Sequence, residues 1–513
     1  MKFELNEFIT ASGESILYCG EPDLERFDQL AAGPGDIWHS SFEQGYKNAF
    51  PELVYQTAVM FWYLNDFDDL EQCVSWRINP NQFAVRKSVW EITRGFDADY
   101  ENIQMQALDF GFRTIRYLGA VPLYVKQLFR STTEENITIS PKDRYTFFLK
   151  NFRKRHAVFM LFRVGFWKVK EWTAYLYASN HFSLRQHTAL VAPRELQQIV
   201  GNPSVNYIIP TMLRQEFTVQ LLEDLSNQTY KPFRVIVVDA TPITERDESF
   251  YKKSYPFELI VIWQQSKGSC RARNEAIDCC KGDYVIFGDD DIRIAEDFIE
   301  NHIRLLQTYN AEACNGLDVR AMHHQQTLDD LKQAIAMLKP QQKIVGTAQM
   351  FSNANSCVKY SLVKALIGND VNFDGGYGED SDFGMSLTKI GATVLNNPFS
   401  ANLHLKPPAG GYRFWGTQAK VTGKKRKKQP WELDTPVKWI KPVPSPTVMY
   451  GILKQFTPQQ LIEYKYKHFS YYLFDGSKSG FLYRLIRIPY KNLQFRKSVF
   501  YAKKLIKSGT RYK

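Results

Sequence analysis

Residues 282–294 read GDYVIFGDDDIRI, a short apolar run followed directly by three carboxylates. The apolar run predicts a buried strand, and Asp289, Asp290 and Asp291 would then stand at its carboxyl end. Ligands of an open α/β sheet bind outside the carboxyl ends of its strands. Hard divalent cations prefer carboxylate oxygens as ligands. The stretch therefore predicts a metal site at a sheet edge, with an acidic turn that caps the next helix as the alternative.

The residues around this stretch alternate between strand-like and helix-like patterns. Strands are expected at 207–209, 234–238, 258–263 and 284–287, and helices at 219–225 and 271–280. Near-continuous apolar strands that alternate with helices predict an α/β fold, a mostly parallel sheet with helices on both faces. Pro210 is expected to stop the first strand, and Asp239 closes the second. Asp239 would lie at the same edge as Asp289–Asp291, and acids from separate strands are harder to explain as helix caps.

The chain of 513 residues is too long for one ordinary core. Four segments are expected: an α+β accessory domain over 1–130, a basic-aromatic helical connector over 131–200, the α/β domain over 201–410, and a basic-aromatic helical region over 411–513. Within the last segment, KPVPSP at 441–446 predicts an extended linker.

The net charge of +11 is concentrated in a few segments. Residues 476–513 hold eleven Lys or Arg and no Asp or Glu, with aromatic side chains between them, and two further basic runs span 424–428 and 150–177. Basic amphipathic helices with aromatic anchors suit an anionic membrane surface. They would also suit nucleic acid, but no nucleic-acid-binding motif accompanies them, so no nucleic acid is expected. A solvated basic surface without a partner is the third alternative.

The sequence also predicts the compartment. No apolar stretch reaches about 18 residues, so no transmembrane helix is expected, and the first residues lack the pattern of a secretory signal. The seven cysteines form no CxxC pair and no Cys/His cluster, which argues for a reducing compartment and against a structural zinc site. We expect a cytoplasmic protein with peripheral contact to the membrane face.

Several of these motifs together resemble family 2 glycosyltransferases, which have the GT-A nucleotide-diphospho-sugar transferase fold. The chain carries IIPT at 208–211, VIVVD at 235–239, ARN at 272–274, GDYVIFGDDD at 282–291 and GEDSD at 378–382, in the order of the family. Each piece is weak alone, and together they are specific. The resemblance implies an inverting transfer of a sugar from a nucleotide-diphosphate donor.

The resemblance implies a donor site. Pro210, Thr211 and Asp239 match the positions that bind the base and ribose, and Arg273 and Asn274 match those near the diphosphate; a guanidinium binds phosphate oxygens well. The alternatives are a turn residue for Asp239 and an exposed helix cation for Arg273. The family usually continues this Asp as a DDGS-like string, whereas this chain has Asp-Ala-Thr. The nucleotide is therefore open, with a UDP-sugar as the first expectation.

The resemblance also implies a metal site. Asp289 and Asp291 match the outer acids of the DXD motif, which holds Mn²⁺ or Mg²⁺ against the donor phosphates. Asp290 would orient its neighbours or contact the donor sugar. His404 lies where related enzymes place a third metal ligand; a structural histidine is the alternative.

The acceptor side of the resemblance lies in GGYGEDSDFGM at 375–385. Its glycines allow a tight loop, and a helix is expected to start near Glu379. The resemblance makes Asp380 the general base for the acceptor hydroxyl and Glu379 a residue that binds acceptor or donor sugar. By spacing, Glu379 and Asp382 share a helix face while Asp380 points elsewhere. The alternative is that these acids only stabilise the helix start.

Residues 81–121 resemble the acceptor half of the same family a second time, in a degenerate form. Asp109-Phe110-Gly111 aligns with Asp382-Phe383-Gly384, which places Gln106 and Ala107 opposite Glu379 and Asp380. Alanine cannot accept a proton, so residues 1–130 are interpreted as a partial, noncatalytic glycosyltransferase-like domain. Coincidence around a Phe-Asp turn is the alternative.

The leading hypothesis is a metal-dependent inverting glycosyltransferase that acts on a glycan or lipid-linked glycan in cell-surface polysaccharide biosynthesis. A sugar nucleotidyltransferase is the first competitor, although such enzymes typically open with a Gly-rich loop where this chain has Ile209-Pro210-Thr211. A noncatalytic glycan-binding protein is the second, although the chain keeps both the base and the metal acids.

Overall fold

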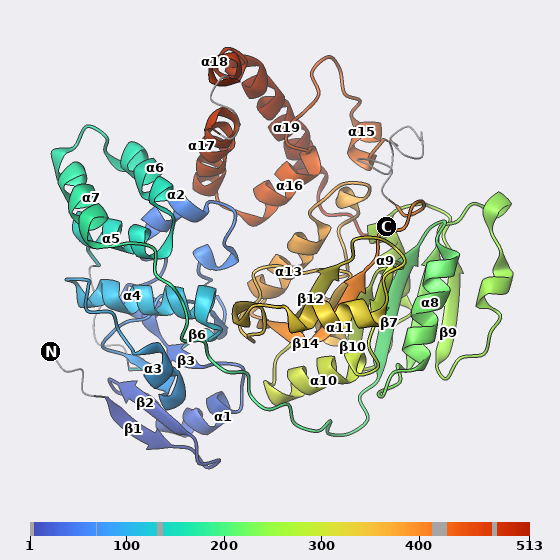
Figure 1. Ribbon diagram of the computed structural model, residues 1–513, viewed down its shortest axis with the longest axis horizontal. Coiled ribbons are helices and arrows are strands. Elements are labelled where there is room, and N and C mark those ends of the chain that lie inside the picture. Colours follow the sequence, from blue (N-terminus) through green and yellow to red (C-terminus); the bar gives the residue numbers. More distant parts are fainter. Residues whose placement is uncertain (1–4, 68, 131–136, 413–427, 475–479) are drawn as a thin grey trace.

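Two halves, each built around its own β-sheet, lie side by side in the molecule. The computed structural model describes residues 5–67, 69–130, 137–412, 428–474 and 480–513. In Figure 1 the N-terminal half is at the left in blue to teal, the half that follows residue 204 is at the right in green to orange, and C-terminal helices in red stand above. None of the described helices combines the length and the apolar character needed to cross a lipid bilayer. All seven cysteines are free thiols.

The second half contains an eight-stranded sheet in the order β11-β14-β12-β13-β10-β7-β8-β9. Its strands are β7 (Val205–Thr211), β8 (Arg234–Asp239), β9 (Glu258–Trp263), β10 (Tyr284–Gly288), β11 (Ile292–Ile294), β12 (Ala313–Arg320), β13 (Asn355–Lys359) and β14 (Val394–His404). β10, β7, β8 and β9 run parallel. β13 is antiparallel to β10 and β12, and β14 is parallel to β12. The predicted α/β fold with a mostly parallel sheet is confirmed.

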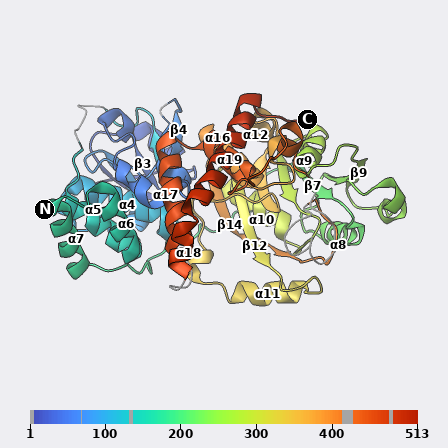
Figure 2. The same ribbon diagram turned by 90° about the horizontal axis from the view of Figure 1, so that it is seen from above.

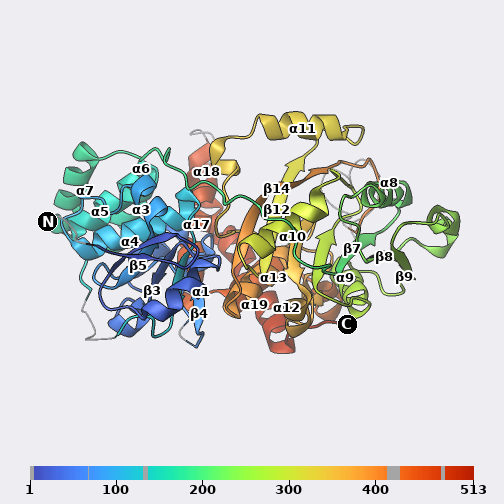
Figure 3. The same cartoon turned by 90° about the horizontal axis from the view of Figure 1, so that it is seen from below.

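Helices cover both faces of this sheet. They are α8 (Gln215–Ser226), α9 (Ser269–Asp278), α10 (Phe298–Thr308), α11 (Leu328–Ala336), α12 (Tyr360–Ala365) and α13 (Glu379–Lys389). Successive side chains of a strand point to opposite faces. Ile208 accordingly packs in one apolar cluster with Ala272 of α9, and Tyr207 packs in another with Leu221 of α8 and Phe298 of α10. α11 lies apart from these helices, at the margin of the molecule (Figure 3).

Pro210 lies inside β7, so the prediction that it stops the strand is wrong. β10 pairs with β7 only as far as Ile208, opposite Phe287. Beyond that point β7 pairs with β8 alone, with Pro210 opposite Val238. Proline lacks an amide hydrogen but is tolerated where one side of the strand has no partner to receive it. The strand therefore continues to Thr211 and carries that residue to the sheet edge.

The N-terminal half contains a six-stranded sheet in the order β1-β2-β5-β3-β6-β4. Its strands are β1 (Asn6–Ile9), β2 (Ser15–Cys19), β3 (Ile37–His39), β4 (Gln72–Val74), β5 (Phe83–Arg86) and β6 (Pro122–Val125). Four of them repeat part of the second sheet: β5 is antiparallel to both β2 and β3, and β3 is parallel to β6. The order β2-β5-β3-β6 thus has the same pairing senses as β10-β13-β12-β14.

Helices complete the N-terminal half. They are α1 (Phe27–Ala31), α2 (Val54–Thr57), α3 (Lys87–Thr93), α4 (Ile103–Arg113), α5 (Pro141–Asn151), α6 (Lys154–Val164) and α7 (Val169–His181). The order β5, α3, α4, β6 matches the order β13, α12, α13, β14 in the second half. α4 begins well before Asp109, whereas α13 begins only three residues before Asp382. Ala107 consequently lies past the first turn of α4 and is fully buried.

The C-terminal helices bridge the two halves. They are α15 (Pro430–Asp434), α16 (Pro446–Gln455), α17 (Pro458–Phe474), α18 (Phe481–Ile486) and α19 (Ile488–Ser508). From above, α17 lies across the boundary between the halves (Figure 2). Two of the aromatic residues in the basic tail, Phe495 and Tyr501, are core residues that pack with Phe373 of the second half. They are not available to a membrane. Of the basic run 424–428, only Lys428 lies within the described residues.

Apolar contacts join the halves into one cluster. Trp62 of the N-terminal half lies against Gly384 of α13, where an added Cβ would come within 2.6 Å of its ring. Tyr63 donates its hydroxyl to the Ala348 carbonyl at 2.7 Å. Both side chains belong to the buried cluster that also contains Phe287 and Phe383 of the second half. The half without a candidate base therefore supports the helix that carries one.

Two helical glycines offer a matched test of how closely α4 and α16 are packed. An added Cβ at Gly111 in α4 would stand 1.9 Å from the Trp76 carbonyl oxygen, whereas at Gly451 in α16 its nearest neighbour would be 3.5 Å away. We expect Gly111→Ala to destabilise the protein by about 1–3 kcal/mol, because the backbone at Trp76 must move. Gly451→Ala should stabilise it by about 0.5–1 kcal/mol through helix propensity. Thermal unfolding checks both, and similar melting temperatures for the two variants would contradict the packing.

Candidate functional site

The three consecutive acids leave the end of β10 in different directions. Gly288 has no room for a side chain, because a Cβ there would come within 2.5 Å of the Tyr207 ring. Asp289 is partly exposed, while Asp290 and Asp291 are buried. The short strand β11 follows at once and pairs with β14, with Ile292 opposite His404. This pairing brings the end of β14 next to the acids.

Asp289, Asp291 and His404 form a cluster that could hold a metal ion. Each offers one ligand atom, and these atoms all lie within 4.8 Å of one another. Two carboxylate oxygens and an imidazole nitrogen are a donor set that suits Mn²⁺, and the carboxylates also suit Mg²⁺. His404 Nδ1 lies 3.0 Å from Asp318 Oδ1, the kind of outer contact that orients a metal-binding histidine. The residues present therefore fit a divalent cation.

Cations of the protein neutralise these acids in the structure. Arg214 Nη1 lies 2.7 Å from Asp291 Oδ2 and 3.1 Å from Asp290 Oδ1. Burial lowers the pKa of His404, but hydrogen bonds to Asp291 and Asp318 outweigh that effect and raise the pKa to about 11. Asp291 and Asp318 thus favour the protonated form of His404. A divalent cation would replace that proton, because metal ligands must be deprotonated.

Asp290 turns away from the cluster. Thr211 donates its hydroxyl to Asp290 Oδ2 at 2.8 Å, and Arg214 reaches the other oxygen. Burial raises the pKa of Asp290 to about 7, against the opposing effect of Arg214. These contacts tie the end of β7 to the acids. The orienting role of Asp290 and its contact with a donor sugar both stay predictions.

Arg273 connects the metal-ligand cluster to the candidate base. It lies in α9, fully buried, with Nη2 2.6 Å from Asp289 Oδ1. Burial lowers its pKa, but Asp289, Asp380 and Glu379 raise it above the ordinary value. The guanidinium therefore lies in the field of the acids from both β10 and α13. It is a buried ion-pair residue rather than an exposed helix cation.

The acids of the GEDSD motif divide between two sides of α13, as the spacing predicts. The helix begins at Glu379, directly after Gly378 in the left-handed region at φ 110°. Glu379 and Asp382 are buried, and Asp380 is half-buried in the first turn. Asp382 accepts hydrogen bonds from Lys454 at 2.8 Å and from Gln455 at 2.7 Å, both in α16. These bonds fix α13 against α16.

Asp239 closes β8 and is fully buried. Its Oδ1 accepts a bond from the Thr241 amide and its Oδ2 accepts one from the Tyr251 hydroxyl, both at 2.8 Å. The first bond is that of a turn residue, and the second brings Tyr251 over the carboxylate. Each oxygen has a further lone pair for ribose or base.

Asn274 is engaged within the protein. Its amide donates to the carbonyls of Asn369 and Tyr512 at 2.8 and 2.7 Å, and its oxygen accepts from the Asn369 amide. These bonds hold the end of the described chain against the loop before α13. Contact with a diphosphate stays a prediction for Asn274.

A cavity of about 270 Å³ opens at the carboxyl ends of β7 and β9. Met212, Gly268, Ser269, Asp374 and Tyr412 are among its lining residues. Asp374 accepts a bond from the Cys270 amide in the first turn of α9 at 2.7 Å. Burial raises the pKa of Asp374 to about 6. The cavity thus opens between β7 and the loop before α13.

Sequence reasoning missed three residues of this site. Arg214, which pairs with Asp290 and Asp291, stands three residues after Thr211, just before α8. Asp318, the partner of His404, lies in β12, which sequence analysis did not recognise as a strand. Asp374 caps α9 from a distant loop. An Arg three residues after the first strand was a usable signal for the first of them.

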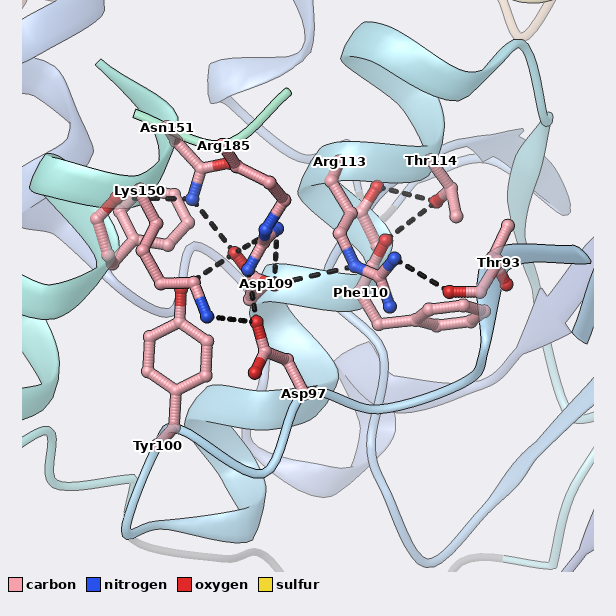
Figure 4. Close-up of polar contacts among 12 residues, drawn as sticks. Thr93, Asp97, Tyr100, Asp109, Phe110, Arg113, Thr114, Lys150, Asn151 and Arg185 are labelled. Atoms are coloured by element: carbon pink, nitrogen blue, oxygen red, sulfur yellow. Dashed lines mark hydrogen bonds and ion pairs between the residues drawn. The ribbon is translucent and has the colours of Figure 1, made fainter. Parts of the chain in front are cut away.

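The N-terminal half has an equivalent acid in place of Asp382, surrounded by cations. Figure 4 shows Asp109 at the centre of this network. Its carboxylate accepts bonds from Tyr100 at 2.8 Å and Asn151 at 2.8 Å, and Arg185 Nη1 lies 3.1 Å from it. Arg185 and Lys150 also both contact Asp97. Asp382 of the second half likewise accepts a bond from a cation, Lys454.

Part of the second half matches a known family in sequence. Residues 207–363 match the sequence model described as glycosyl transferase family 2. An uncharacterised glycosyltransferase of Rickettsia bellii is 28% identical over 127 residues, which are 24% of this chain and 18% of that protein. One from Haemophilus influenzae is 33% identical over 88 residues, 17% of this chain and 29% of that protein. The chain thus covers less than a third of either relative.

Solved structures of glycosyltransferases match about 60% of this chain, at low sequence identity and low TM-score. The mannosyltransferase PcManGT from Pyrobaculum calidifontis, in complex with GDP-Man and Mn²⁺, is 16% identical with a TM-score of 0.35, over 61% of this chain and 90% of that one. TarS 1-349 of S. aureus in complex with UDP-GlcNAc is 15% identical with a TM-score of 0.36, over 60% and 93%. The family match covers β7, β8 and β10, which lead to the acids, and α9, which carries Arg273. Residues 207–363 are thus similar in sequence to family 2 glycosyltransferases.

Proposed function

We propose that this chain is a metal-dependent, inverting glycosyltransferase that moves a sugar from a nucleotide-diphosphate donor to a glycan or lipid-linked glycan. One observation carries the proposal: Asp289, Asp291 and His404 offer their ligand atoms within 4.8 Å of one another, and Arg273, which pairs with Asp289, lies in the field of Asp380. A donor held at Asp289 and a base at Asp380 would then face the same space.

The proposed reaction is a single displacement. Asp380 takes the proton of the acceptor hydroxyl as its oxygen attacks C1 of the donor sugar from the side opposite the diphosphate. The C1–O bond breaks, and its electron pair leaves with the nucleoside diphosphate. Mn²⁺ or Mg²⁺ held by Asp289, Asp291 and His404 would neutralise charge on that leaving group. Arg273 adds a fixed positive charge, which costs no reorganisation because the side chain is already held.

The donor nucleotide would lie across the ends of β7 and β8. Thr211 and Asp239 end these strands as direct neighbours, and the cavity of about 270 Å³ opens on the same side. Carboxylate and hydroxyl groups suit a ribose. A UDP-sugar is the first donor to test.

The N-terminal half is proposed to be noncatalytic. Its four repeated strands and Asp109 resemble the acceptor half of the second sheet, but Ala107 is buried where Asp380 is accessible. Its role would be to support α13 and to hold part of the acceptor.

A peripheral position on a cytoplasmic membrane face, as in cell-surface polysaccharide synthesis, is the finer proposal. Large apolar side chains stand out in solvent around α6, α7 and α18, namely Phe162, Trp167, Leu176, Leu482 and Ile486. Basic residues lie between them. Exposed apolar and basic groups together suit an anionic lipid surface.

A panel of nucleotide sugars tests the transfer reaction. We expect release of a nucleoside diphosphate that requires Mn²⁺ or Mg²⁺ and is stimulated by a glycan acceptor. Release of pyrophosphate from a nucleoside triphosphate and a sugar phosphate would instead identify a nucleotidyltransferase and contradict the proposal. Glycan binding without turnover of any donor would identify a binding protein.

A further inference from the structure

A second cavity, of about 630 Å³, lies between the N-terminal half and α17. None of its lining residues belongs to the candidate active site. Its cations are Arg116, Arg153, Arg155, Arg185 and Lys467, and the lining residues within the described chain include no Asp or Glu. Pockets of this size hold ligands of several hundred daltons. Its chemistry therefore favours an anion.

The cations at its mouth have no acidic partner. Arg153 and Arg155 are exposed at the start of α6, and no described carboxylate lies within ion-pair distance of them. Arg185, by contrast, forms ion pairs with Asp97 and Asp109. Burial lowers the pKa of Lys467 to about 8. Burial, and then Lys467, Arg155 and Arg153, lower the pKa of His156 to about 4. The cavity thus concentrates uncompensated positive charge.

A more apolar cavity of about 420 Å³ continues from the cavity of about 630 Å³. The two share Arg155, His156, Lys467 and Tyr471. Beyond these residues the cavity of about 420 Å³ is lined by Val158, Phe159, Phe162, Ser470 and Phe474. Phe162 is 60% and Phe474 72% exposed. A contiguous patch of exposed apolar side chains often marks an interaction site.

The two walls of this combined site are fixed to each other. Arg163 of α6 forms a two-pronged ion pair with Glu463 of α17, with nitrogen–oxygen distances of 3.0 and 2.6 Å. Lys467 donates to the Gln56 carbonyl and lies over the Phe159 ring at 5.8 Å. Such a site is preorganised, so a ligand would lose little affinity to ordering the protein.

We propose that these joined cavities bind a phosphate-bearing lipid. The phosphate would lie against Arg153, Arg155 and Lys467, and the hydrocarbon chain would run along Phe159, Phe162 and Phe474. A free anion would leave the apolar part unused, and a neutral amphiphile would leave the cations unused. The inference goes beyond the transfer reaction, because it concerns where lipid is held and would stand whatever the donor is.

Calorimetric titration with three probes tests the site, with the two amphiphiles kept below their micellar concentrations. The probes are dodecyl phosphate, dodecyl maltoside and inorganic phosphate. We expect dodecyl phosphate to bind at least about tenfold more tightly than either other probe, because it alone meets both parts of the site. Equal affinity for dodecyl phosphate and dodecyl maltoside would overturn the charged half of the proposal. Equal affinity for dodecyl phosphate and inorganic phosphate would overturn the apolar half.

Matched variants locate the binding. The double variant Arg153→Gln/Arg155→Gln should weaken dodecyl phosphate about tenfold, while Lys154→Gln, in the same helical turn but outside the cavity, should not. Phe162→Ser should weaken it as well, and Ile243→Ser, a similarly exposed residue of the second half, should not. Equal losses in a variant and its control would overturn the assignment.

Two further measurements separate this inference from the proposed reaction. Asp380→Asn should bind dodecyl phosphate as the unaltered chain does, whatever its turnover. Vesicles of phosphatidylcholine with phosphatidic acid should sediment the protein better than phosphatidylcholine alone, and Arg153→Gln/Arg155→Gln should lose that difference. A difference retained in full by the double variant would place lipid binding elsewhere on the surface.

Discussion

Asp380→Asn is expected to lower kcat for sugar transfer by about 10²–10⁴-fold, while the KM for the donor changes little. Loss of a general base removes that factor from the chemical step. Asn keeps the size of the side chain but cannot accept the proton at neutral pH. Steady-state release of nucleoside diphosphate with the acceptor in excess gives both constants.

Asp329→Asn is the matched control for this prediction. Asp329 is also an acid in the first turn of a helix, and its side chain is 82% exposed on α11. It should keep full activity. Both variants lose one acid near a helix start, which costs about 0.3–1 kcal/mol of stability, so melting temperatures should fall equally little. An Asp380→Asn enzyme with near-normal kcat would remove the base from the proposal.

Asp289→Asn is expected to abolish metal-dependent turnover and to weaken Mn²⁺ binding by at least about 100-fold. Substitution of an outer partner of a metal site costs about 10–100-fold, and loss of a ligand should cost more. Chelation with EDTA should inactivate the enzyme, and added Mn²⁺ should restore it. The same addition should fail to restore Asp289→Asn. Calorimetric titration of Mn²⁺ gives the affinities.

Two companion variants sharpen the metal test. Asp318→Asn removes the partner of His404 Nδ1 rather than a ligand, so Mn²⁺ affinity should fall by about 10–100-fold and turnover should return at high Mn²⁺. Asp297→Asn changes an exposed acid just before α10 and should behave as the unaltered chain does. Mn²⁺ affinity unchanged in Asp289→Asn would show that the acids serve the fold alone.

The parts of the fold with strong local patterns were predictable. β8 and β10 are nearly continuous apolar runs, and a buried parallel strand has that composition. The start of α13 at Glu379 follows from the glycines before it. The cluster of Asp289, Asp291 and His404 could be anticipated because the family pattern names all three positions.

The antiparallel part of the sheet and its contacts were not predictable from local pattern. β12 and β14 carry Asn, Asp and Pro among their apolar residues, so neither reads as a strand. Asp318 and its pairing with His404 depend on the parallel register between these two strands. Nothing in the sequence near either residue specifies that register.

The C-terminal helices were predicted, but not what covers them. The pattern of an amphipathic helix predicts an apolar face, but it does not indicate whether that face packs against lipid or against protein. In α19 the protein meets it, since Phe495 and Tyr501 are buried against the second half. Only residues on the other faces of these helices, such as Tyr490 and Phe500, are left for a membrane.

The continuous apolar cluster across the two halves has a consequence for cooperativity. A cut near residue 204 would expose Trp62 on one side and the Phe351 and Gly384 surface on the other. Neither fragment would then have a closed core, since each lacks the surface that completes it. We therefore expect the two halves to unfold in a single transition, because each half completes the core of the other.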